Sequence, residues 1–360
     1  MRYAAWLLFS LIMLGPLSPY GFISSTSAQG AAKQTTGTSE AGYTAAVRAF
    51  KAHDYDVAFG LALKAAQTGD VRAQLLVGSM YNNGEGIEQS YAKAAQWFRR
   101  AADQGNADAL FALGVIEQNG LAVKSDPAKA RELFAKAAKA GHAGAQLQLA
   151  LMLAAGDGGP QNMKEAARWF EASAKAGNAQ AQYNLGVLYA SGQEKSQNIA
   201  EAAEWFRRAA EQGNPDASYN LGLLHMEGTS VEQNYAEAVK WFEPAATAGI
   251  PEAQTALGLL YYNGTGVEKN EKTAVKWFAE AAFRGDVLAQ NRLARLYFLG
   301  KGIEKDVVAS YTWYTIARRN GMEDEQLADA LEPEMTPEYL AEAKKAIADW
   351  DTLESGNPAP

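Results

Sequence analysis

Apolar and polar positions along the chain repeat with a period of 36 residues. Most periods contain a pair of adjacent aromatic residues: Trp97-Phe98, Trp169-Phe170, Trp205-Phe206, Trp241-Phe242, Trp277-Phe278 and Trp313-Tyr314. In one period Leu133-Phe134 occupies this position. Glycine keeps the same spacing in two series, one from Gly69 to Gly321 and one from Gly84 to Gly300. Self-similarity at a fixed period of this length is typical of repeat proteins. The sequence therefore predicts seven complete units of 36 residues over residues 70–321.

Each unit predicts two helices, as the stretch from Asn106 to Gly141 illustrates. Asn106 is a favourable helix N-cap, apolar residues follow it at helical spacing, and Gly120 suits the left-handed residue that ends a helix. Pro127 suits the first turn of a second helix, which Gly141 ends. Because a capping residue directly follows most of these glycines, the turn to the next unit is short, and we expect neighbouring helices to be antiparallel.

Small residues occupy two positions of every predicted first helix. One is alanine in all seven units, and the other is glycine or alanine: Gly78, Gly114, Ala150, Gly186, Gly222, Gly258 and Ala294. Small side chains let helix axes approach closely, and we expect the aromatic pairs to fill the space between one unit and the next. One unit cannot bury such a pair alone, so the sequence predicts an all-α solenoid in which units stack on their neighbours.

The repeated pattern also carries a family resemblance. It reads A-x-x-x-L-G-x-x-Y-x-x-G-x-G followed by A-x-x-W-F-x-x-A-A-x-x-G, and it is met most fully at 181–213 and 253–285. This pattern resembles the SEL-one-like repeat, a relative of the tetratricopeptide repeat. Single units depart from it, for example at Glu117, His225, Glu194 and Ser230. The resemblance implies a right-handed superhelical α/α solenoid whose first helices line a concave groove used for partners.

The remaining segments divide the chain further. Residues 29–41 form a polar, low-complexity linker, and residues 42–69 look like a shortened unit that caps the N-terminal end of the stack. Residues 322–353 leave the pattern for two polar amphipathic helices, broken near Pro333 and Pro337, and residues 354–360 form a tail. Because the ends of a stack expose an unpaired face, we interpret 42–69 and 322–353 as terminal caps.

Residues 1–28 are typical of a secretory signal peptide. Arg2 precedes an eleven-residue, mostly apolar stretch from Ala4 to Leu14, and small residues surround a cleavage point after Ala28. The apolar stretch is shorter than a membrane span, although an uncleaved N-terminal anchor is the alternative. We therefore expect a periplasmic or secreted protein.

Composition narrows the chemistry. The chain has no cysteine, and its three histidines, His53, His142 and His225, lie far apart, so a metal site or a histidine-assisted nucleophile is not expected. No cofactor motif is present. A net charge of −8 is opposite in sign to what a nucleic-acid-binding protein needs. Paired carboxylates such as Glu201 and Glu204 lie beside Arg207 and Arg208, as on an ordinary charged outer face.

The resemblance places a set of side chains on the groove. We expect these residues to bind the partner: Tyr183, Asn184, Tyr219, Asn220, Met226, Tyr262, Asn291, Arg292 and Arg295. Amide and aromatic side chains suit a peptide, because Asn bonds the backbone while Tyr and Met supply apolar contact. Neighbouring aliphatic residues, namely Val187, Leu223 and Leu259, are equally well explained as core between helices.

These observations favour an exported, non-catalytic scaffold or regulator that binds an envelope protein or peptide, with membrane association only indirect or peripheral. Two alternatives stay open. One is a glycan- or cell-wall-associated hydrolase with unrecognised carboxylate chemistry, and the other is a carbohydrate-binding accessory protein that uses Tyr183, Tyr219 and Tyr262. The sequence leaves the partner, the pathway and the oligomeric state open.

Overall fold

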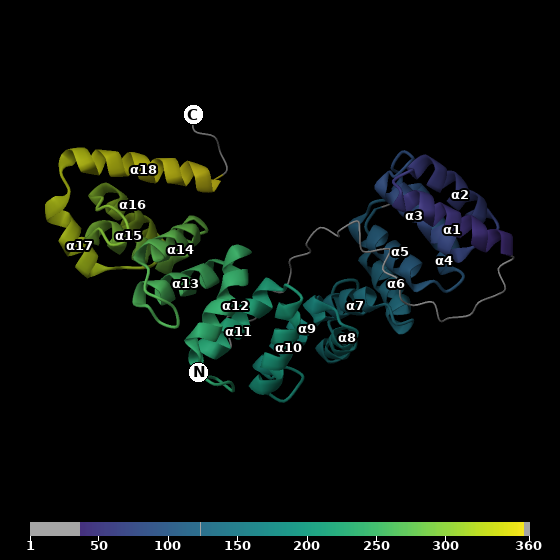
Figure 1. The fold of residues 1–360 in the computed structure, drawn as a ribbon, viewed down its shortest axis with the longest axis horizontal. Coiled ribbons are helices and arrows are strands. Elements are labelled where there is room, and N and C mark those ends of the chain that lie inside the picture. The colour runs from purple at the N-terminus through teal and green to yellow at the C-terminus, as the bar shows by residue number, and fades with distance from the viewer. Residues whose placement is uncertain (1–36, 123, 356–360) are drawn as a thin grey trace. The chain divides into compact units, whose positions relative to one another are not determined.

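A computed structural model describes residues 37–122 and 124–355, and every regular element in these ranges is helical. The predicted signal peptide lies outside the described residues. The helices group into two units, residues 1–197 and 198–360, which we describe separately. Within each unit successive helices pack side by side as pairs, as Figure 1 shows. The prediction of an all-α solenoid built from helix pairs is confirmed.

The described part of the first unit contains nine helices: α1 (Gly37–Lys51), α2 (Tyr55–Gln67), α3 (Val71–Asn83), α4 (Tyr91–Ala102), α5 (Ala107–Asn119), α6 (Pro127–Lys139), α7 (Ala143–Ala155), α8 (Met163–Lys175) and α9 (Ala179–Ser191). The described part of the second unit contains α10 (Ile199–Glu211), α11 (Pro215–Glu227), α12 (Tyr235–Thr247), α13 (Pro251–Asn263), α14 (Glu271–Phe283), α15 (Val287–Leu299), α16 (Val307–Arg319), α17 (Glu325–Leu331), the 3-10 turn η2 (Glu332–Glu334) and α18 (Pro337–Ser355).

The predicted capping residues set the helix ends. The amide of Ala109 donates to Asn106 Oδ1 at 2.8 Å, so Asn106 is the N-cap of α5. Gly120 ends α5 with a φ of 66°, in the left-handed region where glycine carries no steric cost. Pro127 is the first residue of α6, and Gly141 follows its end. The predicted boundaries of both helices are therefore confirmed.

The two residues of an aromatic pair make different contacts. A Cβ atom on Gly78 of α3 would lie 2.5 Å from the ring of Phe98 in α4, so the buried phenylalanine packs within its own helix pair. Trp97 is half-buried and packs against a core cluster formed by α1, α2 and α3. Phe98 also belongs to a buried cluster with Ala109, Ala112 and Leu113 of the next unit. The prediction that the aromatic residues fill the space between units is therefore confirmed for Phe98, whose ring in addition occupies the room that Gly78 leaves inside the pair.

The loop after each first helix keeps its shape where glycine is replaced. Gly266 has a φ of 72°, and a Cβ there would collide with the backbone of Tyr235 at the start of α12. Glu194 and Ser230 stand at the same position of other units and still adopt left-handed φ values of 58° and 60°. A non-glycine residue in this region is strained, so the stacked helices impose the loop conformation on these two residues.

Further helices form the two ends of the described chain. Helix α1 begins at Gly37, so residues 37–41 are helical and the linker assigned to 29–41 was drawn too long. At the other end, α18 lies against α16, where the rings of Trp350 and Trp313 are 5.1 Å apart (Figure 1). Pro337 is the first residue of α18, because proline needs no amide partner there.

Candidate functional site

Two of the predicted groove residues lie on α9 of the first unit and are buried. Tyr183 is 6% exposed and Asn184 is 5% exposed. Val187, one turn further along α9, is also buried, so the interpretation of Val187 as core holds. The expectation that Tyr183 and Asn184 present open side chains to a partner is therefore wrong.

The equivalent residues on α11 of the second unit are half-buried. Tyr219, Leu223 and Met226 pack on one side against a core cluster and remain partly open on the other. Asn220 Nδ2 donates to the backbone oxygen of Asp216 at 2.8 Å, which uses one amide hydrogen and leaves the side chain half-exposed. One side of these side chains packs against the core, and the other side is accessible to a partner.

Helices α13 and α15 continue this surface within the second unit. Leu259 and Tyr262 of α13 and Phe298 of α15 are half-buried and pack against the core cluster of the last repeats. Lys301 Nζ lies 3.5 Å from Tyr262 Oη. We call the apolar row formed by these helices the inner stripe, and define it by its members: Tyr219, Leu223, Met226, Leu259, Tyr262 and Phe298.

The remaining predicted residues on α15 have different roles. Asn291 is 6% exposed and donates from Nδ2 to Asp324 Oδ2 at 2.8 Å. Arg295 donates from Nε and Nη2 to the two oxygens of Asp324, each at 2.6 Å. Asn291 and Arg295 thus hold the start of α17, and assigning them to the groove was wrong because α17 covers this end of the first helices. Arg292 is exposed.

Asp324 is the centre of this C-terminal contact. Burial acts to raise the pKa of its carboxyl, but the hydrogen bonds from Arg295, Asn291 and the amide of Leu327 outweigh burial and hold the pKa below its usual value. The carboxylate is therefore charged at neutral pH and caps α17 while it pairs with α15. No local sequence pattern indicates this cluster, because its members lie about 30 residues apart.

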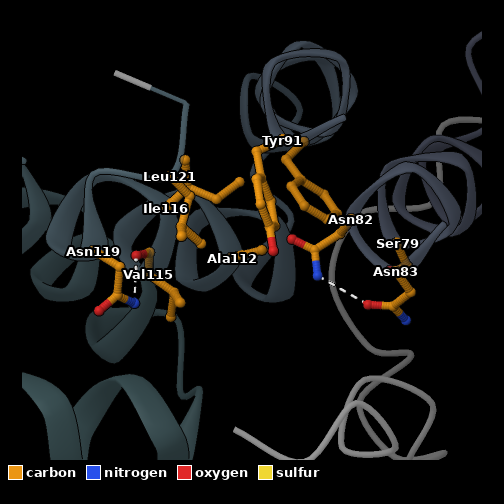
Figure 2. A pocket seen from close by; sticks show the side chains of 10 residues that line it. Ser79, Asn82, Asn83, Tyr91, Ala112, Val115, Ile116, Asn119 and Leu121 are labelled. Atoms are coloured by element: carbon orange, nitrogen blue, oxygen red, sulfur yellow. Dashed lines mark hydrogen bonds between the residues drawn. The ribbon is translucent and has the colours of Figure 1, made fainter. Parts of the chain in front are cut away.

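A pocket lies between α3 and α5 in the first unit, at positions that the sequence analysis did not single out. It has a volume of about 160 Å³. Figure 2 shows the ring of Tyr91 between Asn82 on one side and the pair Ile116 and Leu121 on the other. The complete lining is Ser79, Asn82, Asn83, Tyr91, Phe98, Ala112, Val115, Ile116, Asn119 and Leu121. The adjacent amides Asn82 and Asn83 at the end of a first helix were the available signal.

The outer helices carry paired charges. Glu204 accepts from Arg207 at 2.5 Å and from Arg208 at 3.2 Å, and Glu201 accepts from the indole of Trp205 at 3.0 Å. Each of these carboxylates has a neighbouring donor, as on an ordinary solvated face. Within the described ranges, no group of three or more His, Asp or Glu side chains is placed to hold a metal ion. None of the described helices combines the length and apolar character needed to cross a membrane.

The helix pairs, their close glycine contacts and the partly open first-helix faces define an α-solenoid repeat protein. The Sel1 repeat model matches seven consecutive segments, 71–106, 107–142, 143–178, 179–214, 215–250, 251–286 and 287–322. The chain belongs to the Sel1 repeat family, so the predicted resemblance is confirmed.

Two solved structures are similar over most of the chain. One is c5321, described as a protective antigen of uropathogenic Escherichia coli with an SLR fold. It is 28% identical, the match covers 87% of this chain and 76% of c5321, and the TM-score is 0.61. The other is a Sel1 repeat protein from Oxalobacter formigenes, 29% identical, with 83% of this chain and 88% of that chain covered and a TM-score of 0.59. No functionally curated protein matches the chain significantly.

Proposed function

We propose that the protein is an exported, non-catalytic scaffold or regulator that binds a protein or peptide partner in the cell envelope through the first-helix face of its repeats. Sel1 repeat proteins generally mediate protein–protein interactions, and seven such repeats cover residues 71–322 of this chain. The signal-like segment at residues 1–28 supports the exported location.

The inner stripe of the second unit is the observation that carries this proposal. Its six apolar side chains come from α11, α13 and α15, and all are only half-buried. A group of partly exposed apolar side chains on one part of a folded protein is a common sign of an interaction site, whereas single exposed apolar residues are not. Asn220 and Arg292 border the stripe and supply polar contacts for a peptide backbone or side chain.

A catalytic role finds less support. The paired carboxylates Glu201 and Glu204 are engaged with Trp205, Arg207 and Arg208. General acid–base chemistry on a glycan requires two carboxylates facing a shared substrate cleft. These carboxylates instead lie on α10, the second helix of a repeat, whereas the inner stripe comes from first helices.

A double substitution on the inner stripe tests the proposal. Met226→Ala with Tyr262→Ala is expected to weaken capture of the envelope partner by at least about fivefold, because both side chains supply adaptable apolar contact. The measurement is a quantitative pull-down of one identified partner from the envelope fraction, with the unfolding midpoint of each variant as the check on folding.

The matched control is Glu201→Ala with Glu204→Ala on the outer helix α10, which is expected to leave capture unchanged. If the outer pair abolishes capture and the inner pair does not, the partner binds the second helices and the proposed site is wrong.

A further inference from the structure

We propose that the pocket between α3 and α5 takes one large apolar side chain of an extended peptide and holds the flanking peptide backbone with the amides at its rim. The inference rests on the proposed function for its class of partner, a peptide, but it concerns a separate place in the first unit. Nothing in the inner stripe of the second unit is needed for it.

The floor of the pocket is apolar and of the right size. Phe98, Ala112 and Ile116 are buried core residues, and Leu121, 40% exposed, forms an open wall. A cavity of about 150 Å³ with an apolar lining accepts a benzene molecule. The pocket, at about 160 Å³, therefore has room for a leucine, isoleucine or phenylalanine side chain.

One wall of the pocket carries a smaller residue than the equivalent position of later repeats. Ser79 lines the pocket, and the same position of the later first helices carries a larger apolar residue in Val115, Leu151, Val187, Leu223 and Leu259. The Ser79 hydroxyl donates to the backbone oxygen of Leu75 at 3.0 Å, so its polar group is satisfied within α3. A small, internally bonded side chain thus leaves the site open toward the apolar floor.

The rim offers hydrogen-bonding atoms that the fold leaves available. Asn82 donates from Nδ2 to Asn83 Oδ1 at 2.9 Å, and Asn119 donates from Nδ2 to the Val115 oxygen at 3.0 Å, as the dashed lines in Figure 2 show. Their Oδ1 atoms remain as acceptors. Tyr91 Oη accepts from Gln89 at 3.0 Å and keeps its own proton to donate. Acceptors and a donor side by side match the alternating N–H and C=O groups of an extended backbone.

Charge favours a neutral ligand. None of the ten lining residues is charged. Asn83 donates from Nδ2 to Glu85 Oε2 at 3.3 Å, so an anionic ligand entering beside Asn83 would approach a carboxylate. A cationic side chain would have to leave water for the apolar floor, which costs more than the nearby carboxylate returns. The occupant is therefore an uncharged apolar side chain between two peptide groups.

The smallest probe with this chemistry is N-acetyl-leucine methylamide, a single leucine between two amides. Saturation-transfer NMR on the purified chain is expected to show its methyl groups bound with a dissociation constant on the order of millimolar, as suits so small a ligand. The variant Ser79→Leu is expected to abolish this signal, because leucine fills the pocket and is already present at this position in α11 and α13. Its folding is checked by the unfolding midpoint.

A second pair of variants isolates the rim. Asn119→Ala is expected to weaken binding by about three- to tenfold through one lost hydrogen bond. Asn263→Ala changes the same position at the end of α13 and is expected to have no effect, since Asn119 and Asn263 are both exposed residues that end a first helix. N-acetyl-aspartate methylamide and N-acetylglucosamine serve as the anionic and glycan comparisons and are expected not to bind.

Three results would overturn the proposal: no binding of the leucine probe, binding that survives Ser79→Leu, or preferential binding of N-acetylglucosamine. Leucine binding that survives Ser79→Leu but falls in Met226→Ala with Tyr262→Ala would assign the probe to the inner stripe. That outcome would contradict the proposed pocket but not the proposed function. Conversely, the probe could bind at the pocket while the inner-stripe variant leaves partner capture unchanged. That outcome would contradict only the assignment of the partner to the inner stripe.

Discussion

At the scale of single residues, His142 departs from the other caps of the first helices. Most of these caps are Asn or Asp, whereas at α7 the amide of Ala145 donates to His142 Nδ1 at 3.0 Å. The imidazole also stacks on Phe111, with ring centroids 4.4 Å apart. Since a protonated Nδ1 is a donor, the cap exists only while the ring is neutral.

This geometry predicts a pH-dependent contribution to stability. Burial lowers the pKa of His142, and the carboxylate of Asp108, 3.5 Å from Nε2, opposes that effect without reversing it. A folded-state pKa below the unfolded value means that the unfolded chain binds the proton more tightly. The contribution is therefore complete above about pH 6.5 and is lost as the pH falls below that value.

Urea unfolding at pH 7.5 and at pH 5.5 measures this effect against His142→Asn, which restores the common amide cap. We expect the wild-type chain to lose more stability than the variant on acidification, by up to about 1 kcal/mol, the usual worth of an N-cap. His53 and His225 are present in both proteins, so their contributions cancel in the comparison. Equal losses in the two proteins would contradict the assigned role of His142.

At the scale of helices, the two residues of each aromatic pair are expected to differ in energetic weight. Phe242 is fully buried, and a Cβ on Gly222 of α11 would lie 2.7 Å from its ring, so Phe242 fills the space inside its helix pair. Trp241 is half-buried. Adjacent residues on one helix thus have very different exposure.

Phe242→Ala is expected to cost about 3–5 kcal/mol, because the closely packed glycine cannot move in to refill the space. Trp241→Ala is expected to cost less than half as much, since water already reaches part of its ring. Chemical denaturation of both variants decides between them. A larger loss for Trp241→Ala would mean that the half-buried indole contributes more to stability than the buried ring of Phe242.

At the scale of the whole chain, local signals predicted the helices and longer-range contacts limited the prediction of the site. Asn106, Gly120 and Pro127 act within a few residues of their own positions, so the sequence was sufficient to place α5 and α6. Position within the repeat also identified the half-exposed row on α11 and α13.

The exposure of single side chains was harder to predict, because equivalent positions in different repeats are covered by different neighbouring residues. Tyr183 is buried on α9, while Tyr219, one repeat later, is half-exposed. Asn291 and Arg295 lie on α15, the first helix of the last repeat, where α17 takes the place of a further repeat. Their partner Asp324 is 33 residues from Asn291 and 29 residues from Arg295 in the sequence. The pocket is lined by Ser79, at a position that is apolar in most other repeats. This departure is visible in the sequence, but its consequence depends on how α3 and α5 pack together.

The contact between α15 and α17 predicts how the C-terminal end of the stack responds to mutation. Asp324→Ala removes the partner of Arg295 and the N-cap of α17 together, which is expected to cost about 2 kcal/mol, less than for a fully buried pair because Arg295 is partly exposed. Repeat proteins transmit stability mainly between neighbours, so hydrogen exchange is expected to accelerate in α17 and α18 while amides of the first unit keep their protection. Asp351→Ala breaks the exposed pair with Arg319 in the same cap and is expected to change exchange little. Acceleration spread evenly over both units would mean that the chain unfolds as one cooperative body, and that Asp324 does more than hold the cap in place.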